Sequence, residues 1–329
     1  MTLTKKENLL ETIRGGRPDR FVDQFSYMEF AGNPIRSNVG CFIEEGEEGC
    51  DGWGVKYIYP RGTPGTFPDC EGENKLLKDV TQWKEVIRAP RLLYSAEEWA
   101  PYVETAKTID RNEVFCAAWI APGIFERLHS FMGMEDTMIN FYEEPEAMHE
   151  LIDFLAQWEV DYASEVVRYL HPEAVFHHDD WGSQRSSFFS PEMFSEFLEP
   201  AYQKIYGFWK ENGVQIIVHH SDSYAANLVP AMIRMGIDIW QGPVTENDIP
   251  AVLRQYGPQI TLMGGLNNGI YDTEDWSREK IQSGLKRLVE DCGNRYLIPA
   301  LTMGGPESIY EGVYDAVSQE VNRLSREYF

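Results

Sequence analysis

Two apolar segments of the chain each end in a cluster of histidine and aspartate. Residues 174–176 lead into His-His-Asp-Asp at 177–180, and residues 214–218 lead into His-His-Ser-Asp at 219–222. A stretch with helical character, 190–212, separates them. This alternation of strand, helix and strand is typical of a parallel α/β sheet. Because the carboxyl ends of parallel strands meet at one edge, we expect both clusters at the edge where such folds carry their chemistry.

The pair His220 and Asp222 has a spacing that suits a metal site. Residues two apart on a strand face the same side, so the imidazole and the carboxylate can converge. Both groups bind zinc at about 2.0–2.2 Å, and a catalytic zinc takes three protein ligands and one open position. The candidates for the remaining ligand are His177, His178, Asp179, Asp180, His219 and Glu246. The alternative is a metal-free polar cluster in which the carboxylate fixes the imidazole tautomer.

Asp179 and Asp180 offer a second kind of chemistry. Adjacent carboxylates repel, so one of the two could hold its proton and act as a general acid. Arg185 could instead neutralise one of them, or bind an anionic group of a substrate in bidentate fashion. A third interpretation is that one of the two aspartates caps a helix turn. The sequence leaves open which of them faces the inside of the sheet.

Aromatic and apolar residues at or near the predicted strand ends predict a pocket with apolar walls. They are Tyr27, Trp53, Trp119, Trp181, Tyr224, Trp240 and Met303. Such a pocket would suit a flat ring substrate. The alternative for each aromatic taken alone is packing in the core.

The hydrophobic pattern predicts seven or eight strands, most of them followed by a helix. The strand candidates lie at 21–28, 114–120, 174–178, 214–219, 237–241, 259–263 and 295–301, and a last helix is expected from about Glu307. This order favours one distorted (β/α)8 TIM barrel over residues 1–329, with a doubly wound sheet as the runner-up. Residues of about 29–110 are expected to form an irregular excursion with two short strands. The Gly-rich stretch 264–269 has the wrong spacing for a phosphate loop and predicts a tight turn.

Composition excludes several classes of partner. The 329 residues carry a formal net charge of −24, which makes nucleic acid and anionic membranes poor partners. No run approaches the ~20 apolar residues of a membrane span, and the charged first residues do not resemble a signal peptide. Five scattered cysteines without a Cys-x-x-Cys motif indicate a reducing compartment. We therefore expect a cytoplasmic protein.

Motifs spread along nearly the whole chain form a recognisable set. They are the opening stretch 8–20, Asp-Gly-Trp-Gly at 51–54, Asp-Asp-Trp-Gly-Ser-Gln at 179–184, Ser-Pro-Glu-Met-Phe at 190–194, His-Ser-Asp at 220–222, Gly-Ile-Asp at 236–238 and Gly-Gly-Leu-Asn at 264–267. With this set the chain resembles the uroporphyrinogen decarboxylase superfamily, which also holds corrinoid-dependent methyltransferases. The resemblance implies a (β/α)8 barrel. It is more specific for the superfamily than for one activity.

The resemblance departs from the true decarboxylases at the end of the first strand. Those enzymes carry the arginine-rich motif Met-Arg-Gln-Ala-Gly-Arg, which holds the substrate carboxylates. Here the corresponding stretch 27–34 contains Glu29, and no arginine follows before Arg36. An acidic protein with this stretch would repel a substrate with eight carboxylates.

The methyltransferase branch often binds zinc through a His-x-Cys pair and a cysteine near the seventh strand. In this chain His220 matches the histidine, Asp222 takes the place of the first cysteine, and 301–303 contain no cysteine. These harder ligands favour zinc acting as a Lewis acid on an oxygen over activation of a thiolate. Similar sequences in anaerobes are aryl-ether demethylases, which pass a methyl group to the cobalt of a separate corrinoid protein.

We therefore expect a methyltransferase that moves a methyl group from a small methylated substrate, most simply an O-methyl aromatic, to a corrinoid protein docked at the strand ends. Zinc on His220 and Asp222, or a protonated Asp179 or Asp180, would stabilise charge on the leaving oxygen. His219 would support the zinc ligands or donate a proton. The predicted substrate-binding residues are Tyr27, Trp119, Trp181, Arg185, Gln241, Asn267 and Met303. The alternatives are a decarboxylase without metal and a non-catalytic binding protein on the same barrel.

Overall fold

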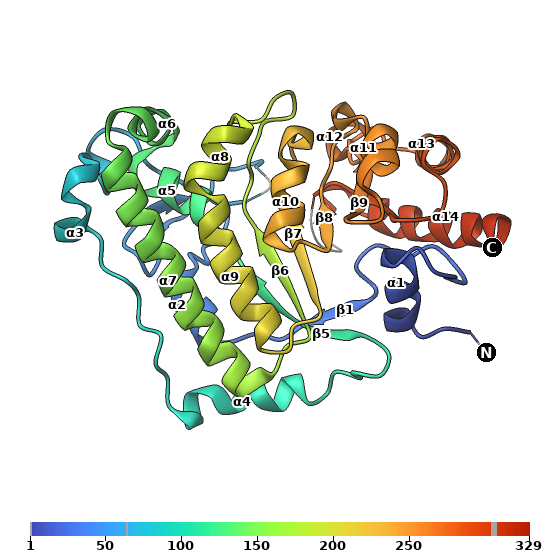
Figure 1. Cartoon of the computed structure of the whole chain (residues 1–329), viewed down its shortest axis with the longest axis horizontal. Helices are drawn as coiled ribbons and strands as arrows, with labels where there is room; N and C mark the ends of the chain where they lie inside the picture. The colour runs from blue at the N-terminus through green and yellow to red at the C-terminus, as the bar shows by residue number, and fades with distance from the viewer. Residues whose placement is uncertain (1, 64, 304–307) are drawn as a thin grey trace.

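A curled sheet of seven parallel strands forms the centre of the protein (Figure 1). The computed structural model describes residues 2–63, 65–303 and 308–329. The strands lie in the order β1-β5-β6-β7-β8-β9-β10. Their bounds are β1 Met28–Phe30, β5 Phe115–Ile120, β6 Ala174–His178, β7 Ile216–His220, β8 Ile239–Gln241, β9 Thr261–Leu266 and β10 Leu297–Leu301. Spatial order therefore follows chain order, as in a barrel wound in one direction.

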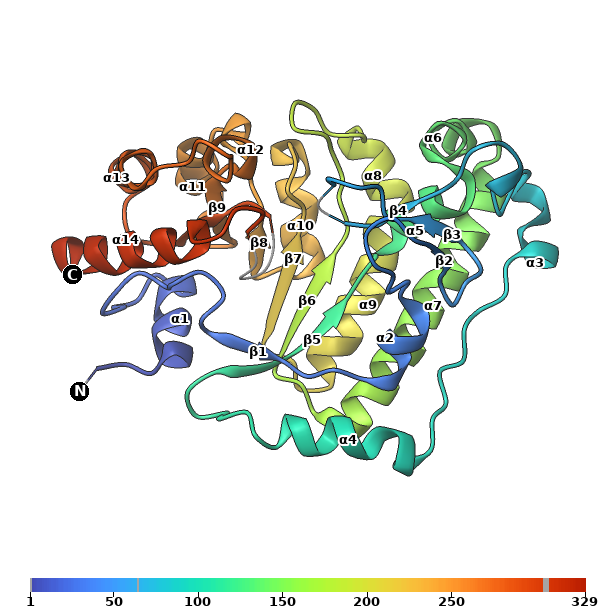
Figure 2. The same ribbon diagram turned by 180° about the vertical axis from the view of Figure 1, so that it is seen from behind.

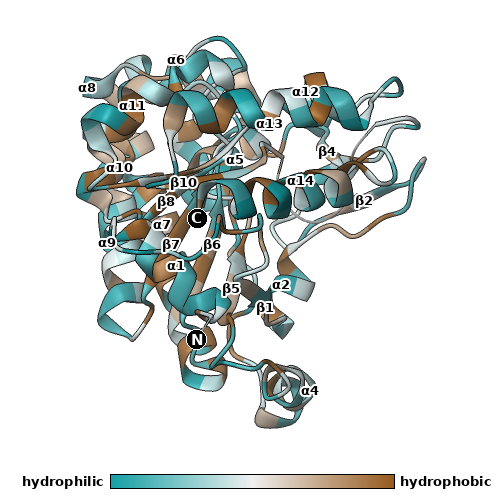
Figure 3. Ribbon diagram, turned by 90° about the vertical axis from the view of Figure 1, so that its right-hand side faces the viewer, coloured by the Kyte–Doolittle hydropathy of each residue, from teal (hydrophilic) through white to brown (hydrophobic). Residues whose placement is uncertain are grey.

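Helices flank the sheet, and the strands carry much of the hydrophobic colour in Figure 3. The helices are α1 Lys5–Ile13, α2 Pro34–Val39, α3 Trp83–Val86, α4 Ala96–Ala106, α5 Ile124–Met132, α6 Met134–Glu143, α7 Pro145–Leu170, α8 Pro191–Phe197, α9 Glu199–Glu211, α10 Val229–Met235, α11 Ile249–Tyr256, α12 Asn268–Tyr271, α13 Arg278–Cys292 and α14 Val313–Tyr328. Of the helices in the described ranges, none combines the length and the apolar character that crossing a membrane requires.

Alternation along the strands divides the core into an inner and an outer part. The inner part holds strand residues such as Phe115, Phe176, Val218 and Met263. The residues between them belong to the outer part, together with the buried faces of the helices. Tyr27, just before β1, reaches across the inner part, and its hydroxyl lies 3.5 Å from the sulfur of Met263 on β9. This enclosed inner core confirms the predicted distorted barrel.

The same alternation decides the direction of the four strand-end histidines. In the register of β6 and β7, His178 lies opposite His220, and His177 lies opposite His219. His178 and His220 continue the inner series of Phe176 and Val218, so they face the inside of the barrel. His177 and His219 face the surrounding helices.

The excursion before β5 folds into a small antiparallel sheet of its own (Figure 2). Its strands are β2 Glu48–Cys50, β3 Lys56–Ile58 and β4 Phe67–Pro68, one strand more than expected. Asp51 closes the turn between β2 and β3 by accepting hydrogen bonds from the amides of Trp53 and Val55. The same carboxylate forms a buried ion pair with Arg127 of α5. The Asp-Gly-Trp-Gly motif therefore ties the excursion to the barrel.

The predicted first strand at 21–28 is wrong in position, because the chain pairs with β5 only from Met28. Phe21 and Val22 are buried as expected of strand residues. However, the amide of Phe21 donates to the hydroxyl of Ser325 on α14 instead of to a strand. Gln24 then takes a positive φ of 42°, which interrupts extended backbone.

Three other boundaries differ from the expectations. The helix predicted over 190–212 is two helices, α8 and α9, with Pro200 in the first turn of the second. The stretch 264–266 belongs to β9 and is no turn; a side chain on Gly265 would meet Leu288 at 2.7 Å. The last helix begins at Val313, and Glu307 lies outside the described residues.

Candidate functional site

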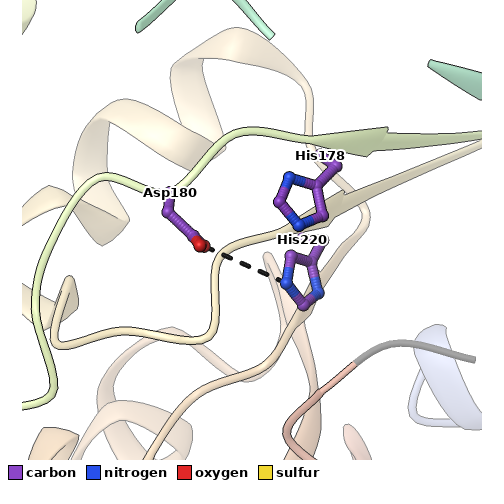
Figure 4. Close-up of side chains that lie close together, drawn as sticks. All are labelled: His178, Asp180 and His220. Carbon is purple, nitrogen blue, oxygen red and sulfur yellow. Dashed lines mark ion pairs between the residues drawn. The ribbon is translucent and has the colours of Figure 1, made fainter. Parts of the chain in front are cut away.

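His178, Asp180 and His220 bring their ligand atoms within 4.8 Å of one another at the carboxyl ends of β6 and β7 (Figure 4). The two imidazole rings are stacked, with 4.3 Å between centroids and 19° between planes. Asp180 lies in the loop after β6, and its Oδ1 is 3.9 Å from His220 Nε2. The backbone amide of Asp222 donates to the same oxygen at 3.0 Å and holds the carboxylate in place. The result is a compact group of the kind that binds divalent metals.

Glu126, in the first turn of α5, orients His178. Its Oε2 lies 2.8 Å from His178 Nδ1, so this nitrogen carries a hydrogen and Nε2 is left for another partner. Burial favours the neutral ring, but the charge and hydrogen bond of Glu126, with the charges of Asp180 and Asp222, raise the pKa of His178 to about 10. A carboxylate that holds a histidine from behind is a common support for zinc ligands.

Gln241 on β8 orients His220. The Gln241 Nε2 donates to the carbonyl oxygen of Thr302 at 2.9 Å, which turns the amide oxygen toward His220 Nδ1. His220 must then donate from Nδ1, so its Nε2 presents a lone pair on the side of Asp180. Burial and the neighbouring His178 lower the pKa of His220 to about 4, and this ring is neutral at physiological pH.

Asp222, predicted as a ligand beside His220, lies next to the group of three. Strand β7 ends at His220, so the alternation that would make the two side chains converge stops there. Within the described ranges, the ligand atoms that gather within 4.8 Å do not include its carboxylate. Burial and the charge of Asp180 raise the pKa of Asp222. Its carboxyl is therefore suited to hold a proton near the site.

The group His178, Asp180 and His220 fits a zinc ion. Two imidazoles and one carboxylate match the three protein ligands of a catalytic zinc site. Donor atoms around tetrahedral zinc lie roughly 3.4 Å apart, so the spacing in the structure requires only small side-chain rotations. His178 and His220 each donate a hydrogen bond to a neighbour and Asp180 accepts one, which limits the freedom lost on binding. Nitrogen and oxygen ligands suit a metal that acts on an oxygen.

A pocket of about 340 Å³ adjoins the group and is lined by His178. Trp119 of β5 forms its aromatic wall on the barrel side, while Arg36 and Phe42 line it from the excursion. Trp119 is stacked on the inner-core Phe176 at 4.7 Å, which fixes the plane of the indole. Of the seven aromatic and apolar residues predicted to form a pocket, and of the predicted substrate-binding residues, only Trp119 lines this one.

Asp179 points away from the pocket and caps α5. Its carboxylate accepts hydrogen bonds from the amides of Phe125 and Glu126 at 3.0 and 2.7 Å. The Tyr202 hydroxyl and the Trp181 indole N–H donate to the same carboxylate. The predicted acid is thus a buried acceptor that positions the start of α5, and with it Glu126.

His219, predicted to act in catalysis, lies on the outer face of the sheet. Its ring is stacked on Trp181 with 3.8 Å between centroids, and its Nδ1 lies 2.7 Å from the Tyr206 hydroxyl. Both His219 and Trp181 are fully buried among the helices. Because successive residues of β7 face opposite sides, His219 cannot join the group formed by His178, Asp180 and His220.

The other predicted substrate-binding residues lie apart from this pocket. Tyr27 is buried in the inner core, and Gln241 stands behind His220. Asn267 donates to the Gln184 side chain at 3.0 Å, which in turn donates to the Asp222 carbonyl at 2.7 Å. This chain of contacts connects the loops after β6, β7 and β9.

Arg185 and Met303 complete the predicted set. Arg185 is exposed in the loop after β6. Met303 is half-buried, and its amide donates to Asn268 Oδ1 at 2.8 Å.

Glu126, Arg127 and Arg36 were not identified from the sequence. Glu126 and Arg127 follow the end of β5, so they share the strand-end position that drew attention to β6 and β7. Arg36 belongs to α2, and neither its spacing nor its neighbours in the chain indicate a pocket position.

The chain is similar to one family model and, at low identity, to solved structures. A family model described as uroporphyrinogen decarboxylase (URO-D) matches residues 100–307. A methyltransferase from Methanosarcina mazei has a TM-score of 0.66 at 14% identity, with 98% of this chain and 99% of that chain covered. The 3-keto-D-glucoside 4-epimerase from E. coli, in apo form, covers 68% of this chain and 85% of its own at 8% identity, with a TM-score of 0.38. No curated protein matches the sequence.

The comparisons differ in what they support. The family match covers more than half of the chain and includes His178, Asp180 and His220. At 14% identity, the likeness to the methyltransferase shows a shared fold. The likeness to the epimerase is too low to support an inference.

Proposed function

Because the chain belongs to the uroporphyrinogen decarboxylase family, we propose that it is a methyltransferase of this family, which moves a methyl group from an O-methyl aromatic substrate to a corrinoid protein. The observation that carries the proposal is the group His178, Asp180 and His220, which is oriented like a zinc site and adjoins a pocket with an aromatic wall. A single aromatic ring can enter this pocket with its methoxy group toward His178.

The size of the pocket supports a small substrate. Its volume of about 340 Å³ is near the lower end of the range for small-molecule sites, which suits a single ring better than a tetrapyrrole. Residues 27–34 also lack the arginines that hold substrate carboxylates in the decarboxylases this chain resembles. Decarboxylation of a smaller substrate without metal remains the alternative within the family.

Cleavage of a methyl ether leaves negative charge on the oxygen, and the site can stabilise this charge. His178 is charged at neutral pH in the metal-free protein and lines the pocket, so it can donate a hydrogen bond to the leaving oxygen. Asp222, with its raised pKa, can supply a proton. When zinc is bound, His178 would instead be neutral and would hold the ion with Asp180 and His220, and the zinc would supply the Lewis acid that acts on the oxygen.

The methyl acceptor is proposed to be the corrinoid of a separate protein. Strand-end faces of such barrels are open to partners because the loops there surround the pocket. Phe42 lines the pocket and is 69% exposed, and Phe67 of β4 is 45% exposed. These two rings give the excursion an apolar surface next to the pocket for a docking protein.

A methyl-transfer assay tests the proposal. The protein would be purified anaerobically without a chelating tag, analysed for zinc, and mixed with methoxybenzenes and cob(I)alamin kept reduced by titanium(III) citrate. We expect near-stoichiometric zinc, methylcobalamin measured by absorbance, and an equal amount of phenol. His220→Ala should lose the zinc and most of the methyl transfer, whereas His149→Ala, a change on the exposed face of α7, should keep both.

Two results would contradict the proposal. Carbon dioxide release from aromatic carboxylates without methylcobalamin would favour the decarboxylase. Ligand binding that survives in His220→Ala and Asp180→Ala, with no turnover in wild type on any donor, would favour a binding protein. A wild-type protein without metal would overturn the zinc part of the mechanism and leave the proton donors.

A further inference from the structure

Arg36 places a positive charge in the wall of the pocket. It belongs to the short helix α2, is half-buried, and lines the same pocket as His178. Its guanidinium carbon lies 5.1 Å from the centroid of the Trp119 ring, at cation–π distance. The contact holds the guanidinium against the aromatic wall of the pocket.

The guanidinium of Arg36 has no acidic partner in the described part of the chain. Its backbone amide donates to Asn33, but its side chain makes no hydrogen bond or ion pair with the described residues. Burial lowers the pKa of Arg36. Arg234, by contrast, pairs with Glu199, and this contact raises the pKa of Arg234. Arg36 is therefore a half-buried cation without an acidic partner among the described residues.

The other charged groups of the pocket already compensate one another. Arg127 pairs with Asp51, and Glu126 pairs with His178. Arg36 is left as one uncompensated positive charge in a protein whose formal net charge is −24. A half-buried charge of this kind is stabilised when an anion binds beside it.

We propose that Arg36 anchors a carboxylate of the substrate, so that the methyl donors are methoxylated aromatic carboxylates. This inference rests on the proposed function and extends it to the substrate class. The planar guanidinium can bind both oxygens of a carboxylate at once. With the carboxylate on Arg36 and the ring beside Trp119, the methoxy group is directed along the pocket toward His178.

The position of Arg36 also argues against cationic methyl donors. A quaternary or protonated amine is recognised by the open face of an aromatic ring. Here Arg36 occupies a face of Trp119 and repels a second cation. A neutral aromatic substrate would contact the same pocket wall but would leave the charge of Arg36 uncompensated.

Equilibrium binding of three probes tests this inference. The probes are 4-methoxybenzoate, 4-methoxybenzamide and 4-methoxybenzylamine, which share the ring and the methoxy group but carry a negative, zero or positive charge. Calorimetry or tryptophan fluorescence would measure their Kd values on the full chain at neutral pH. We expect wild type to bind the benzoate at least 10-fold more tightly than the amide, and the benzylamine most weakly.

Variants at Arg36 complete the test. Arg36→Gln should weaken benzoate binding 10- to 100-fold and leave amide binding within about twofold. Arg36→Lys should restore part of the benzoate preference, and Arg36→Glu should reverse the order in favour of the benzylamine. Arg254→Gln, at an exposed arginine of α11, is the matched control and should change none of the values.

The outcomes separate this inference from the proposed function. Equal binding of benzoate and amide by wild type, or benzoate binding unchanged in Arg36→Gln with a normal melting temperature, would overturn the anchor. Methyl transfer from 4-methoxybenzoate at the same rate in wild type and Arg36→Gln would overturn it too, while leaving the methyltransferase in place. Arg36-dependent benzoate binding without any methyl transfer would support the anchor and count against the function.

Discussion

His178 and His220 are neighbours with the same side chain, yet the residue behind each ring gives them opposite properties. The carboxylate of Glu126 stabilises a charged His178, whereas the amide oxygen of Gln241 accepts a hydrogen from a neutral His220. Their pKa values, about 10 and about 4, lie on opposite sides of neutrality. Two stacked imidazoles can therefore coexist without the repulsion of two like charges. His220 keeps a lone pair for a metal, whereas His178 must lose a proton before it can bind one.

Removing the Glu126 charge should change how stability depends on pH in metal-free protein. The pKa of His178 is raised above its unfolded value of about 6.5, so its stabilising contribution is fully present below pH 6.5. The contribution is lost as the pH rises through about 10. Between pH 7 and 10, wild type should lose more free energy of unfolding than Glu126→Gln, by on the order of 1–2 kcal/mol. Urea unfolding in chelator would measure this difference.

The difference between the two proteins cancels the pH dependence that comes from all other titratable groups, because both proteins contain those groups. The same slope in wild type and Glu126→Gln would show that the Glu126 contact does not set the charge of His178. Glu85→Gln, a change at an exposed residue of α3, should behave as wild type does.

At the scale of elements, the two adjacent aspartates after β6 have different roles. Asp179 turns outward and satisfies the first amides of α5, which carry Glu126 and Arg127 into the pocket wall. Asp180 turns inward and joins the two histidines. One strand end thus both positions the neighbouring helix and supplies a candidate ligand.

Alanine substitutions at this pair should separate stability from metal binding. Asp179→Ala leaves buried donors without an acceptor, so it should lower the free energy of unfolding by about 3 kcal/mol or more. Asp180→Ala should cost less than about 1 kcal/mol, because its side chain is 30% exposed, but it should abolish zinc binding. Denaturant unfolding and metal analysis of both variants would check this. Zinc retained in Asp180→Ala would contradict the ligand set.

Sequence reasoning located most elements because burial and strand alternation are local signals. Strand β6 lies where it was predicted, and the order of strands and helices gave the barrel. His220 and Asp180 were named, and His178 was among the candidates, but the pattern alone did not tell inward from outward residues. That choice depends on the register of β6 on β7, which is a contact between distant segments.

The pocket wall was harder to predict, because much of it comes from the excursion. Arg36 and Phe42 line the pocket because the excursion packs against α5, where Asp51 forms an ion pair with Arg127. No periodicity in the sequence encodes that contact. Asp222, the predicted partner of His220, lies outside the group for a related reason: β7 ends at His220, two residues before Asp222, so strand alternation does not reach it.

On the scale of the whole molecule, the surface and the pocket carry opposite charge. A formal net charge of −24 repels anions at long range, so an anionic substrate gains little from steering. Its affinity would have to come from short-range contact with Arg36. The same net charge makes the folded chain repel itself, and salt screens this repulsion: the Debye length falls from about 30 Å at 0.01 M to about 10 Å at 0.1 M ionic strength.

We therefore expect the melting temperature to rise by a few degrees when sodium chloride increases from 10 to 300 mM, as measured by calorimetry in chelator. Chloride bound at Arg36 could produce a similar rise, so the scan should be repeated on Arg36→Gln. An equal rise in both proteins would assign the effect to general screening, because the substitution removes the local anion site and leaves the surface charge almost unchanged. A fall in melting temperature with salt would contradict the prediction and show that surface ion pairs, such as that between Lys84 and Glu150, contribute more than the net repulsion costs.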